Sequence, residues 1–478
     1  MTFDLLQSLH LILPELVLIT GALLILLVGA FLQGPNAWNS VGYACFGVFV
    51  LAFLASLTLE TGEAFGGQVV NQPITAFIRS FEIVFAAASY LLIHADLERD
   101  HDLRRTETPV LVLLAVAGMG LMVSSGSMMT LYMGLELQSL SLYVLAATKR
   151  DSLKASEAGL KYFVLGALSS GIMLFGISFV YGATGSFSYD VIAKADPMTN
   201  SFLLLGMCLI LLGLAFKVSL VPFHMWTPDV YEGAPTPVTA LFAIVPKVAA
   251  MTLIMNVTYF AFSGISDQWS QILIALSVAS MIVGATGAIM QQNIKRMLAY
   301  SSIAHMGYAL AGLAAGSLEG AAGVVIYMTT YVFMGAGAFS IIMSLRRDDA
   351  PVERISDLSG LSSTHPLLAA GMMVVMFSMA GIPPLAGFFG KWYVFLAAVN
   401  AGLVPLAIIG VLTSVVGAFY YLRIIKLMYF EDADAPLDEG MSRQNRLVLV
   451  ASLAFIILFF LGIGQLSGVV GANIEAFF

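Results

Sequence analysis

Ionisable side chains inside long apolar runs are the residues of this sequence that could do chemistry. Lys247 lies in VPKVAAM (245–251), and Glu136 lies in MGLELQSLSLYVLA (133–146). A charge buried alone in lipid is costly, so it is tolerated where it pairs with another group or lines a water path. A lysine on such a path can exchange a proton during turnover. These residue types therefore point to proton transfer.

A static ion pair that only holds helices together is the alternative interpretation of these charges. The lysines inside apolar runs are Lys161, Lys217, Lys247 and Lys391, whereas Glu136 is the central acid. Because the lysines outnumber this acid, complete static pairing is disfavoured. Arg79 and Glu82 could form a separate ion pair. They are three residues apart, on one face of a predicted helix, and this spacing allows their side chains to meet.

Two proline-rich segments beside lysines predict interrupted helices. FKVSLVPFHMWTPDVYEGAPTPV (216–238) contains Lys217, and MAGIPPLAGFFGKW (379–392) contains Lys391. Proline removes a helical hydrogen bond, and the freed carbonyls need protein or a polar cavity at membrane depth. Corresponding breaks in two halves of a chain indicate repeated transporter units. An ordinary kink beside a snorkelling lysine is the alternative at either break.

Two histidines lie where they could relay protons. His224 is in the first break, and His305 is in SSIAHMGY (301–308), next to hydroxyl side chains. Neutral histidine changes protonation state near physiological pH, so it can pass protons between waters. A buried histidine that only makes hydrogen bonds is the alternative. The neighbouring hydroxyls and lysines favour a relay, especially for His305.

The elements that position these residues are predicted to be membrane-spanning helices. Of 478 residues, 59% are hydrophobic and 10% are charged, which excludes a soluble enzyme, a disordered chain and a nucleic-acid-binding protein. At about 20 apolar residues per crossing, the sequence divides into about fourteen spans. They run roughly over 12–33, 38–59, 74–95, 109–124, 127–148, 155–182, 201–226, 238–262, 270–290, 297–315, 319–345, 366–398, 403–429 and 446–466.

These spans predict an all-α integral membrane protein with two inverted five-helix repeats. Spans 4–8 and 9–13 form the repeats, and the fourth span of each is discontinuous. Five is an odd number, so consecutive units enter the membrane from opposite sides. The predicted divisions are an N-terminal three-helix unit (1–108), the first repeat (109–262), the second repeat (263–430) and a loop with a C-terminal helix (431–478).

Basic residues in alternate loops predict the orientation. One set of loops holds Arg99, Arg104, Arg105, Lys149, Arg150, Lys154, Lys295, Arg296, Arg346, Arg347, Arg354, Arg443 and Arg446. The opposite set holds only Lys194. Loops rich in Lys and Arg face the cytoplasm, so both termini are expected outside. In a bacterial inner membrane, both termini would be periplasmic.

No cofactor site is expected in this chain. Cys45 and Cys208 are far apart, and an iron–sulfur or thiolate zinc site needs clustered ligands. No phosphate-binding loop and no GxGxxG after a strand is present, so NADH, flavin and ATP have no visible site.

The motifs together resemble those of one membrane protein family. PFHMWTPDVYEGAPTPV, MGLELQSLSLYVLA, VPKVAAM and GIPPLAGFFGKW resemble the subunit N family of the bacterial proton-pumping NADH–quinone oxidoreductase, respiratory complex I. The resemblance covers nearly the whole chain. Related antiporter-like subunits usually carry a TWLPDAH-like run after PFH, and one of them a glutamate at the position of Lys391.

The resemblance implies roles for individual residues. Glu136 and Lys217 would form a charge-coupled pair, and Lys247 would be the central relay. His305 would lie between Lys247 and Lys391, which leads to the periplasmic exit. Lys161 matches the lysine that the family carries in span 6, and it would lie beside the half of the path through which protons enter.

The resemblance also implies partners and cofactors. FMN, iron–sulfur clusters and quinone belong to other subunits, and further antiporter-like membrane-arm subunits would be neighbours in the bilayer. Protons would move from cytoplasm to periplasm, driven by quinone reduction elsewhere. The alternatives are an independent cation/proton antiporter subunit and a purely structural arm subunit.

Overall fold

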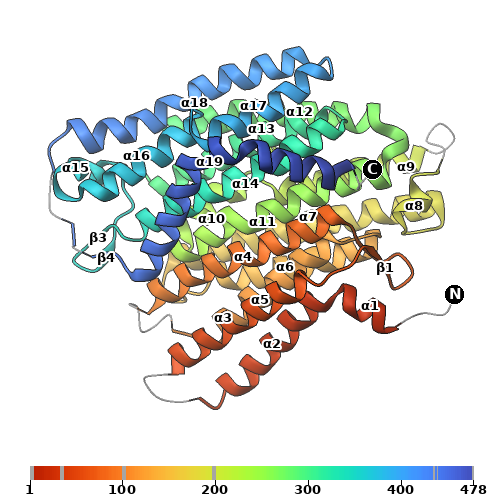
Figure 1. The fold of residues 1–478 in the computed structure, drawn as a ribbon, viewed down its shortest axis with the longest axis horizontal. Coiled ribbons are helices and arrows are strands. Elements are labelled where there is room, and N and C mark those ends of the chain that lie inside the picture. Colours follow the sequence, from red (N-terminus) through yellow and green to blue (C-terminus); the bar gives the residue numbers. More distant parts are fainter. Residues whose placement is uncertain are drawn as a thin grey trace.

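The structure is a bundle of helices with two small hairpins (Figure 1). The computed structural model describes residues 5–32, 37–98, 104–195, 201–433, 437–438 and 440–475. Arg99, one of the basic loop residues used above to predict the orientation, lies outside these ranges. The predicted all-α membrane fold is confirmed.

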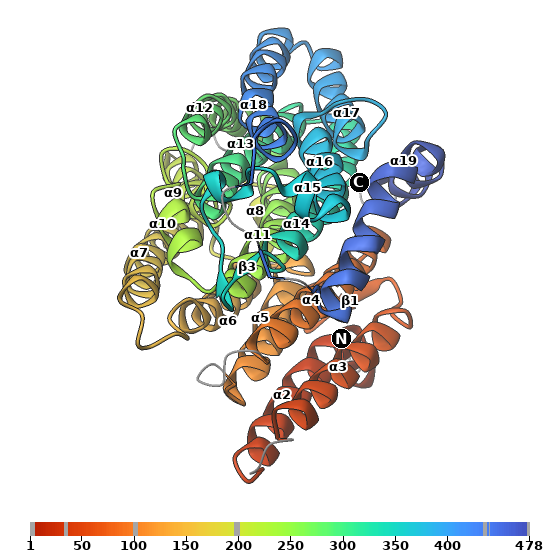
Figure 2. The same ribbon diagram turned by 90° about the vertical axis from the view of Figure 1, so that its left-hand side faces the viewer.

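The chain begins with helices that form one edge of the bundle, at the bottom of Figure 2. The elements are α1 (Leu5–Leu11), α2 (Leu13–Gly29), α3 (Ala37–Ser56), β1 (Gly62–Ala64), β2 (Val69–Asn71) and α4 (Pro73–Leu97). Helix α4 begins with a proline. Proline suits the first helical turn because an N–H at that position would have no acceptor within the helix. β1 and β2 pair antiparallel. These strands close the loop between α3 and α4.

The predicted pairing of Arg79 with Glu82 is wrong. Arg79 Nε donates to Glu15 Oε1 of α2 at 3.0 Å, and its other nitrogens bond Asn71 and the Leu11 carbonyl. Both oxygens of Glu82 are buried without a hydrogen-bond partner among the described residues. Both Glu15 and Glu82 carry a carboxylate, and the packing of α2 against α4 places that of Glu15 against the Arg79 guanidinium.

Replacing Arg79 with leucine is expected to destabilise the N-terminal helices by about 3–5 kcal/mol, because Glu15 would be left as an uncompensated buried charge. The Arg79 and Glu15 side chains are 1% and 3% exposed. Thermal unfolding of the purified complex and the amount of assembled subunit measure the effect. Replacing both residues with leucine should recover most of the loss, and wild-type stability of the single variant would contradict the prediction.

The next helices correspond to the first predicted repeat. They are α5 (Glu107–Val123), α6 (Met128–Ala146), α7 (Leu153–Thr184), α8 (Tyr189–Ile192), α9 (Ser201–Lys217), α10 (Trp226–Gly233) and α11 (Thr236–Asn256), followed by η2 (Val257–Ala261) and η3 (Ser263–Ile265). Between α9 and α10 the chain leaves the helix, as the prolines predict. Lys217 is therefore the last residue of a helix rather than a mid-helix residue.

The C-terminal half has a second helix break. Its elements are α12 (Ser266–Ile289), α13 (Ile294–Ala314), α14 (Leu318–Ile342), β3 (Arg346–Arg347), β4 (Ala350–Pro351), η4 (Ile355–Leu358), α15 (Leu361–Thr364), α16 (Pro366–Ala380), α17 (Ala386–Asn400), α18 (Val404–Phe430) and α19 (Arg443–Glu475). The break lies between α16 and α17. Lys391 is one turn inside α17.

Helices α11 and α14 occupy the middle of the bundle (Figures 1 and 2). Every residue of α11 is buried, which explains why its sequence is apolar on all sides. By length and composition, eight described helices could each cross a membrane, or nine if α1 and α2 form one bent span. Helices α5, α9 and α16 are apolar but shorter. The number of fourteen crossings therefore stays a prediction.

Candidate functional site

The end of α9 presents Lys217 to hydroxyl groups of two neighbouring helices. Lys217 Nζ donates to Ser139 Oγ of α6 at 2.9 Å and to Tyr143 OH at 3.2 Å. It also donates to Ser170 Oγ of α7 at 3.4 Å. These hydroxyls can accept from an ammonium and can donate to a neutral amine. Lys217 therefore keeps its partners whether or not it carries a proton.

Glu136 lies on the same helix as two of these hydroxyls but makes no ion pair with Lys217 in the described part of the chain. Ser139 follows Glu136 by three residues on α6, so the two side chains share a face. Glu136 Oε1 is buried without a hydrogen-bond partner among the described residues. Lys217 thus bonds a serine one helical turn from Glu136, and charge coupling between Glu136 and Lys217 stays a prediction.

Lys247 is held at the interrupted end of α9. Its side chain comes from the middle of α11 and is only 1% exposed. Lys247 Nζ donates to the Val218 carbonyl at 3.1 Å and to Ser219 Oγ at 2.6 Å. The nitrogen also lies 5.8 Å from the centre of the Trp226 ring, a distance at which a cation is attracted to the ring face.

Aromatic rings cover this break. Trp226 Nε1 donates to the Phe216 carbonyl at 3.0 Å, which satisfies one of the free acceptors at the end of α9. The ring of Tyr162 stacks on Trp226 with centroids 4.4 Å apart. The Phe216 and Val218 carbonyls at the break are therefore bonded within the protein, as membrane depth requires.

The second break holds Lys391 in a similar way. Its nitrogen donates to the Met379 and Ala380 carbonyls, both at 3.0 Å, at the C-terminal end of α16. It also donates to Ser414 Oγ of α18 at 2.7 Å. The partially negative end of a helix favours a cation. Lys247 and Lys391 thus each combine helix-end carbonyl groups with one serine hydroxyl.

His305 lies in the second half among tyrosines. Its Nδ1 is 2.6 Å from Tyr327 OH of α14, and its Nε2 is 3.1 Å from Tyr421 OH of α18. Tyr421 is also bonded to Ser301. A neutral imidazole needs one donor and one acceptor, and hydroxyl groups can supply both. His305 therefore has the hydrogen-bond partners of a relay, although a purely structural role would use the same bonds.

His224 and Lys161 lie apart from these lysines. His224 is in the loop between α9 and α10, and its Nδ1 is buried without a hydrogen-bond partner among the described residues. Lys161 Nζ contacts Asp229 at 2.6 Å and Glu157 at 2.7 Å, and its side chain is 40% exposed. Asp229 also pairs with Arg296 at 2.6 Å. Lys161 is therefore part of a charged surface cluster rather than a buried amine.

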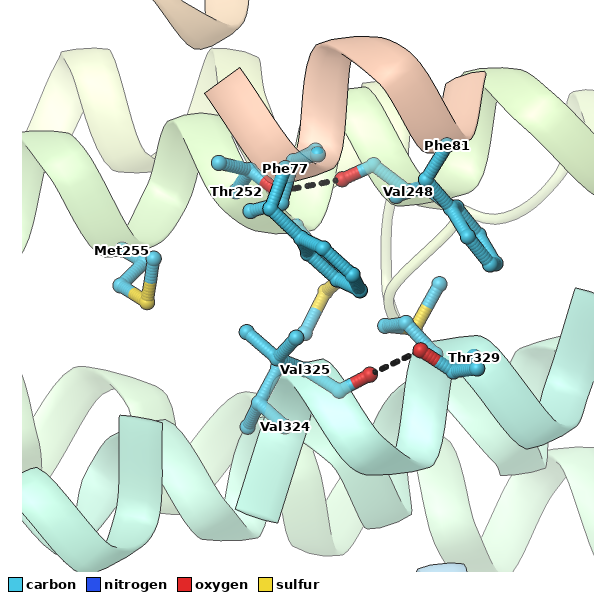
Figure 3. A pocket seen from close by; sticks show the side chains of 11 residues that line it. Phe77, Phe81, Val248, Thr252, Met255, Val324, Val325 and Thr329 are labelled. Carbon is cyan, nitrogen blue, oxygen red and sulfur yellow. Dashed lines mark hydrogen bonds between the residues drawn. The ribbon is translucent and has the colours of Figure 1, made fainter. Parts of the chain in front are cut away.

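A small cavity beside α11 offers no hydroxyl that is free of its own helix (Figure 3). It measures about 20 Å³ and lies between α4, α11 and α14. Thr252 Oγ1 donates to the Val248 carbonyl, and Thr329 Oγ1 donates to the Val325 carbonyl, each within its own helix. Because both hydroxyls are satisfied and the other lining residues are apolar, this cavity does not extend the set of lysines.

The hydroxyl partners are the residues that the sequence did not identify. They include Ser139, Tyr143, Ser170, Ser219, Ser414, Tyr327 and Tyr421. Ser139 could have been found from its helical spacing to Glu136. The tyrosines around His305 come from helices far away in the chain, so no local pattern marks them. In the described ranges, no three His, Cys, Asp or Glu side chains are grouped to hold a metal ion.

Comparison with known proteins identifies the family. The family described as NADH:quinone oxidoreductase/Mrp antiporter, TM, matches residues 125–417. NADH-quinone oxidoreductase subunit N of Rhodospirillum rubrum is 51% identical over 456 residues, which cover 94% of this chain and 93% of that protein. The subunit N of Parvibaculum lavamentivorans is 52% identical over 452 residues, with coverage of 94% and 93%. This chain belongs to the NADH–quinone oxidoreductase subunit N family.

Solved structures agree with this family. A chain of respiratory complex I from Thermus thermophilus with bound aureothin matches with a TM-score of 0.81 and 31% identity, covering 95% of this chain and 98% of that chain. A chain of the Mrp complex from Dietzia sp. matches with a TM-score of 0.85 and 21% identity, covering 99% and 98%. At that identity the second match shows the fold alone. The resemblance of the sequence motifs to the subunit N family is confirmed.

Proposed function

We propose that this chain is a proton-translocating membrane-arm subunit of an NADH–quinone oxidoreductase and that Lys217, Lys247 and Lys391 carry the protons. The observation that supports this most is the kind of partner each amine has. In the described part of the chain, all three donate to hydroxyl or carbonyl oxygens and none lies in an ion pair. A static salt bridge would need a carboxylate within reach, so the structural alternative loses its main support.

Neutral partners suit repeated protonation. A carboxylate would favour the charged ammonium form, whereas a serine or tyrosine hydroxyl bonds both forms of an amine. In the proposed order, Glu136 and Lys217 form the uptake half, Lys247 is the central relay, and His305 leads to Lys391. His224 and Lys161 are assigned to the uptake half, Lys161 as a surface group in its cluster with Asp229.

The proposal includes the arrangement in the membrane. Two inverted five-helix units, 109–262 and 263–430, would each contain one interrupted helix. The N-terminal unit (1–108) and the C-terminal segment (431–478) would flank them. Both termini would be periplasmic in a bacterial inner membrane, and protons would move from cytoplasm to periplasm. FMN, iron–sulfur clusters and quinone would belong to other subunits, as would the quinone reduction that drives transport.

Replacing Lys217 with alanine is expected to lower NADH-driven proton pumping roughly tenfold or more, because the site would lose a proton-exchanging group. Inverted membrane vesicles with a pH-sensitive dye measure pumping, and NADH–quinone reductase activity is measured on the same vesicles. A matched control is Lys194→Ala, which removes a basic residue of a short loop. Full pumping by the Lys217 variant in an assembled complex would contradict the role of this residue.

An independent cation/proton antiporter is the second candidate function, supported by the fold shared with a chain of the Mrp complex. The two candidates differ in their energy source. Purified chain in liposomes should exchange Na⁺ for H⁺ without a redox partner if it is an antiporter. The proposed function predicts no such exchange and requires the assembled complex with NADH.

A further inference from the structure

Ser219 lies in the short segment after α9 that joins two of the proposed proton-carrying lysines. Lys217 is the last residue of α9, and Lys247 bonds Val218 and Ser219 just after it. Ser219 follows Lys217 by two residues, and its Oγ accepts from Lys247 Nζ at 2.6 Å. Thr227 Oγ1 from α10 is also bonded to Ser219 Oγ, at 2.6 Å. The side chain is fully buried. Ser219 therefore connects the end of α9, the start of α10 and the lysine of α11.

The backbone at Ser219 is in a conformation that favours glycine. Its φ is +66°, in the left-handed region, where a side chain is sterically disfavoured. The Leu220 N–H bonds the Ala215 carbonyl, and the Ser219 N–H bonds the Phe216 carbonyl. This pair of bonds is the Schellman ending of a helix, in which the residue at this position is usually glycine. The turn is complete without any side chain of Ser219.

The second break of the same chain uses glycine at the matching position. Gly381 has a φ of +89°. The Ile382 N–H bonds the Phe377 carbonyl and the Gly381 N–H bonds the Ser378 carbonyl, which reproduces the hydrogen bonds of the first break. There the hydroxyl partner of the lysine comes from another helix, through Ser414. The first break thus carries a serine where the second break carries glycine, the less strained residue at positive φ.

We propose that Ser219 is a positioning residue for proton transfer, whose hydroxyl holds the Lys247 amine at the end of the helix that carries Lys217. This inference rests on the proposed function. Strained backbone persists where the surrounding structure requires it, and it gathers at functional sites. The Ser219 hydroxyl, which glycine lacks, accepts a hydrogen bond from Lys247. A shift of the α9 end that follows a change at Lys217 would move this hydroxyl and so change how Lys247 is held.

Ser219→Gly tests this inference because it removes the hydroxyl and relieves the backbone at once. The variant complex should assemble, because relief of the backbone at position 219 offsets part of the cost of removing the acceptor of Thr227 Oγ1 and Lys247 Nζ. NADH-driven pumping should fall roughly tenfold, as expected for the loss of a hydrogen bond to a charged group, and the pH profile of pumping should change. Ser219→Asn should restore part of the pumping, because asparagine tolerates the left-handed region and offers an acceptor oxygen.

The matched control is Ser277→Ala. Ser277 is also fully buried, but its hydroxyl donates to the Gly307 carbonyl between α12 and α13 rather than to a lysine. Its loss should leave the pH profile of pumping unchanged. Wild-type pumping and pH profile in Ser219→Gly would overturn the inference, as would a profile change of equal size in Ser277→Ala.

The proposed function is tested separately in the same vesicles through Lys247→Met. If that variant loses pumping while Ser219→Gly pumps normally, only the role of Ser219 is wrong. If Lys247→Met pumps normally, the proposed function of Lys247 fails, and the role of Ser219 fails with it.

Discussion

Replacing Lys247 with methionine is expected to reduce NADH-driven proton pumping roughly a hundredfold, within the range found when a group that transfers protons is removed. Methionine has a similar unbranched shape, so the centre of α11 should stay filled without an unpaired charge. Lys247 is 1% exposed and bonded to neutral oxygens. Pumping in inverted vesicles, normalised to assembled complex, measures the effect.

Lys295→Met is the control that separates proton transfer from stability. Lys295 is almost as buried as Lys247, but its nitrogen lies 2.6 Å from Glu353. Its removal leaves a partly buried carboxylate unpaired, so the amount of assembled complex should fall. The protons pumped per electron in the complex that does assemble should stay at the wild-type value. An equal loss of this ratio in both variants would contradict the special role of Lys247.

Lys247→Arg distinguishes charge from proton exchange. Arginine keeps a positive charge and can bond the same acceptors, but it does not release its proton in proteins. Pumping should therefore stay low in the arginine variant. Substantial recovery would show that charge alone at this position is sufficient.

The interrupted helices and the buried lysines could be predicted from the sequence because the signals are local. Prolines at 222 and 383–384 mark the places where α9 and α16 cannot continue. A lysine inside an apolar run is visible without knowledge of its neighbours. The proposed chemistry of the site could therefore be inferred from residue types and spacing.

The partners could not be predicted because they come from other helices. Lys217 is 78 residues from Ser139, and Arg79 is 64 residues from Glu15. Helix packing decides which of several serines or acids reaches a given nitrogen, and apolar helices with polar residues on many sides do not specify that packing locally. The Arg79 prediction failed for this reason, since helical spacing offered Glu82 and packing supplied Glu15.

Replacing Lys391 with methionine is expected to reduce pumping to a similar extent, roughly a hundredfold, because protons could not leave the second half. The α16 carbonyls that Lys391 bonds would lose their donor, so some loss of assembly should accompany the effect. Pumping per electron in assembled complex is again the measurement. This variant tests whether the two halves work in series.

Ser414→Ala tests the role of the Lys391 site while the Lys391 amine stays in place. Ser414 Oγ accepts from Lys391 at 2.7 Å, whereas the neighbouring Thr413 bonds carbonyls of its own helix. Ser414→Ala should lower pumping roughly tenfold through the lost hydrogen bond, and Thr413→Val should leave it near the wild-type level. If Lys391→Met abolished pumping while Ser414→Ala did nothing, the two helix-end carbonyls alone would be sufficient to hold Lys391. Serine partners would then matter only in the first half, where Ser219 holds Lys247.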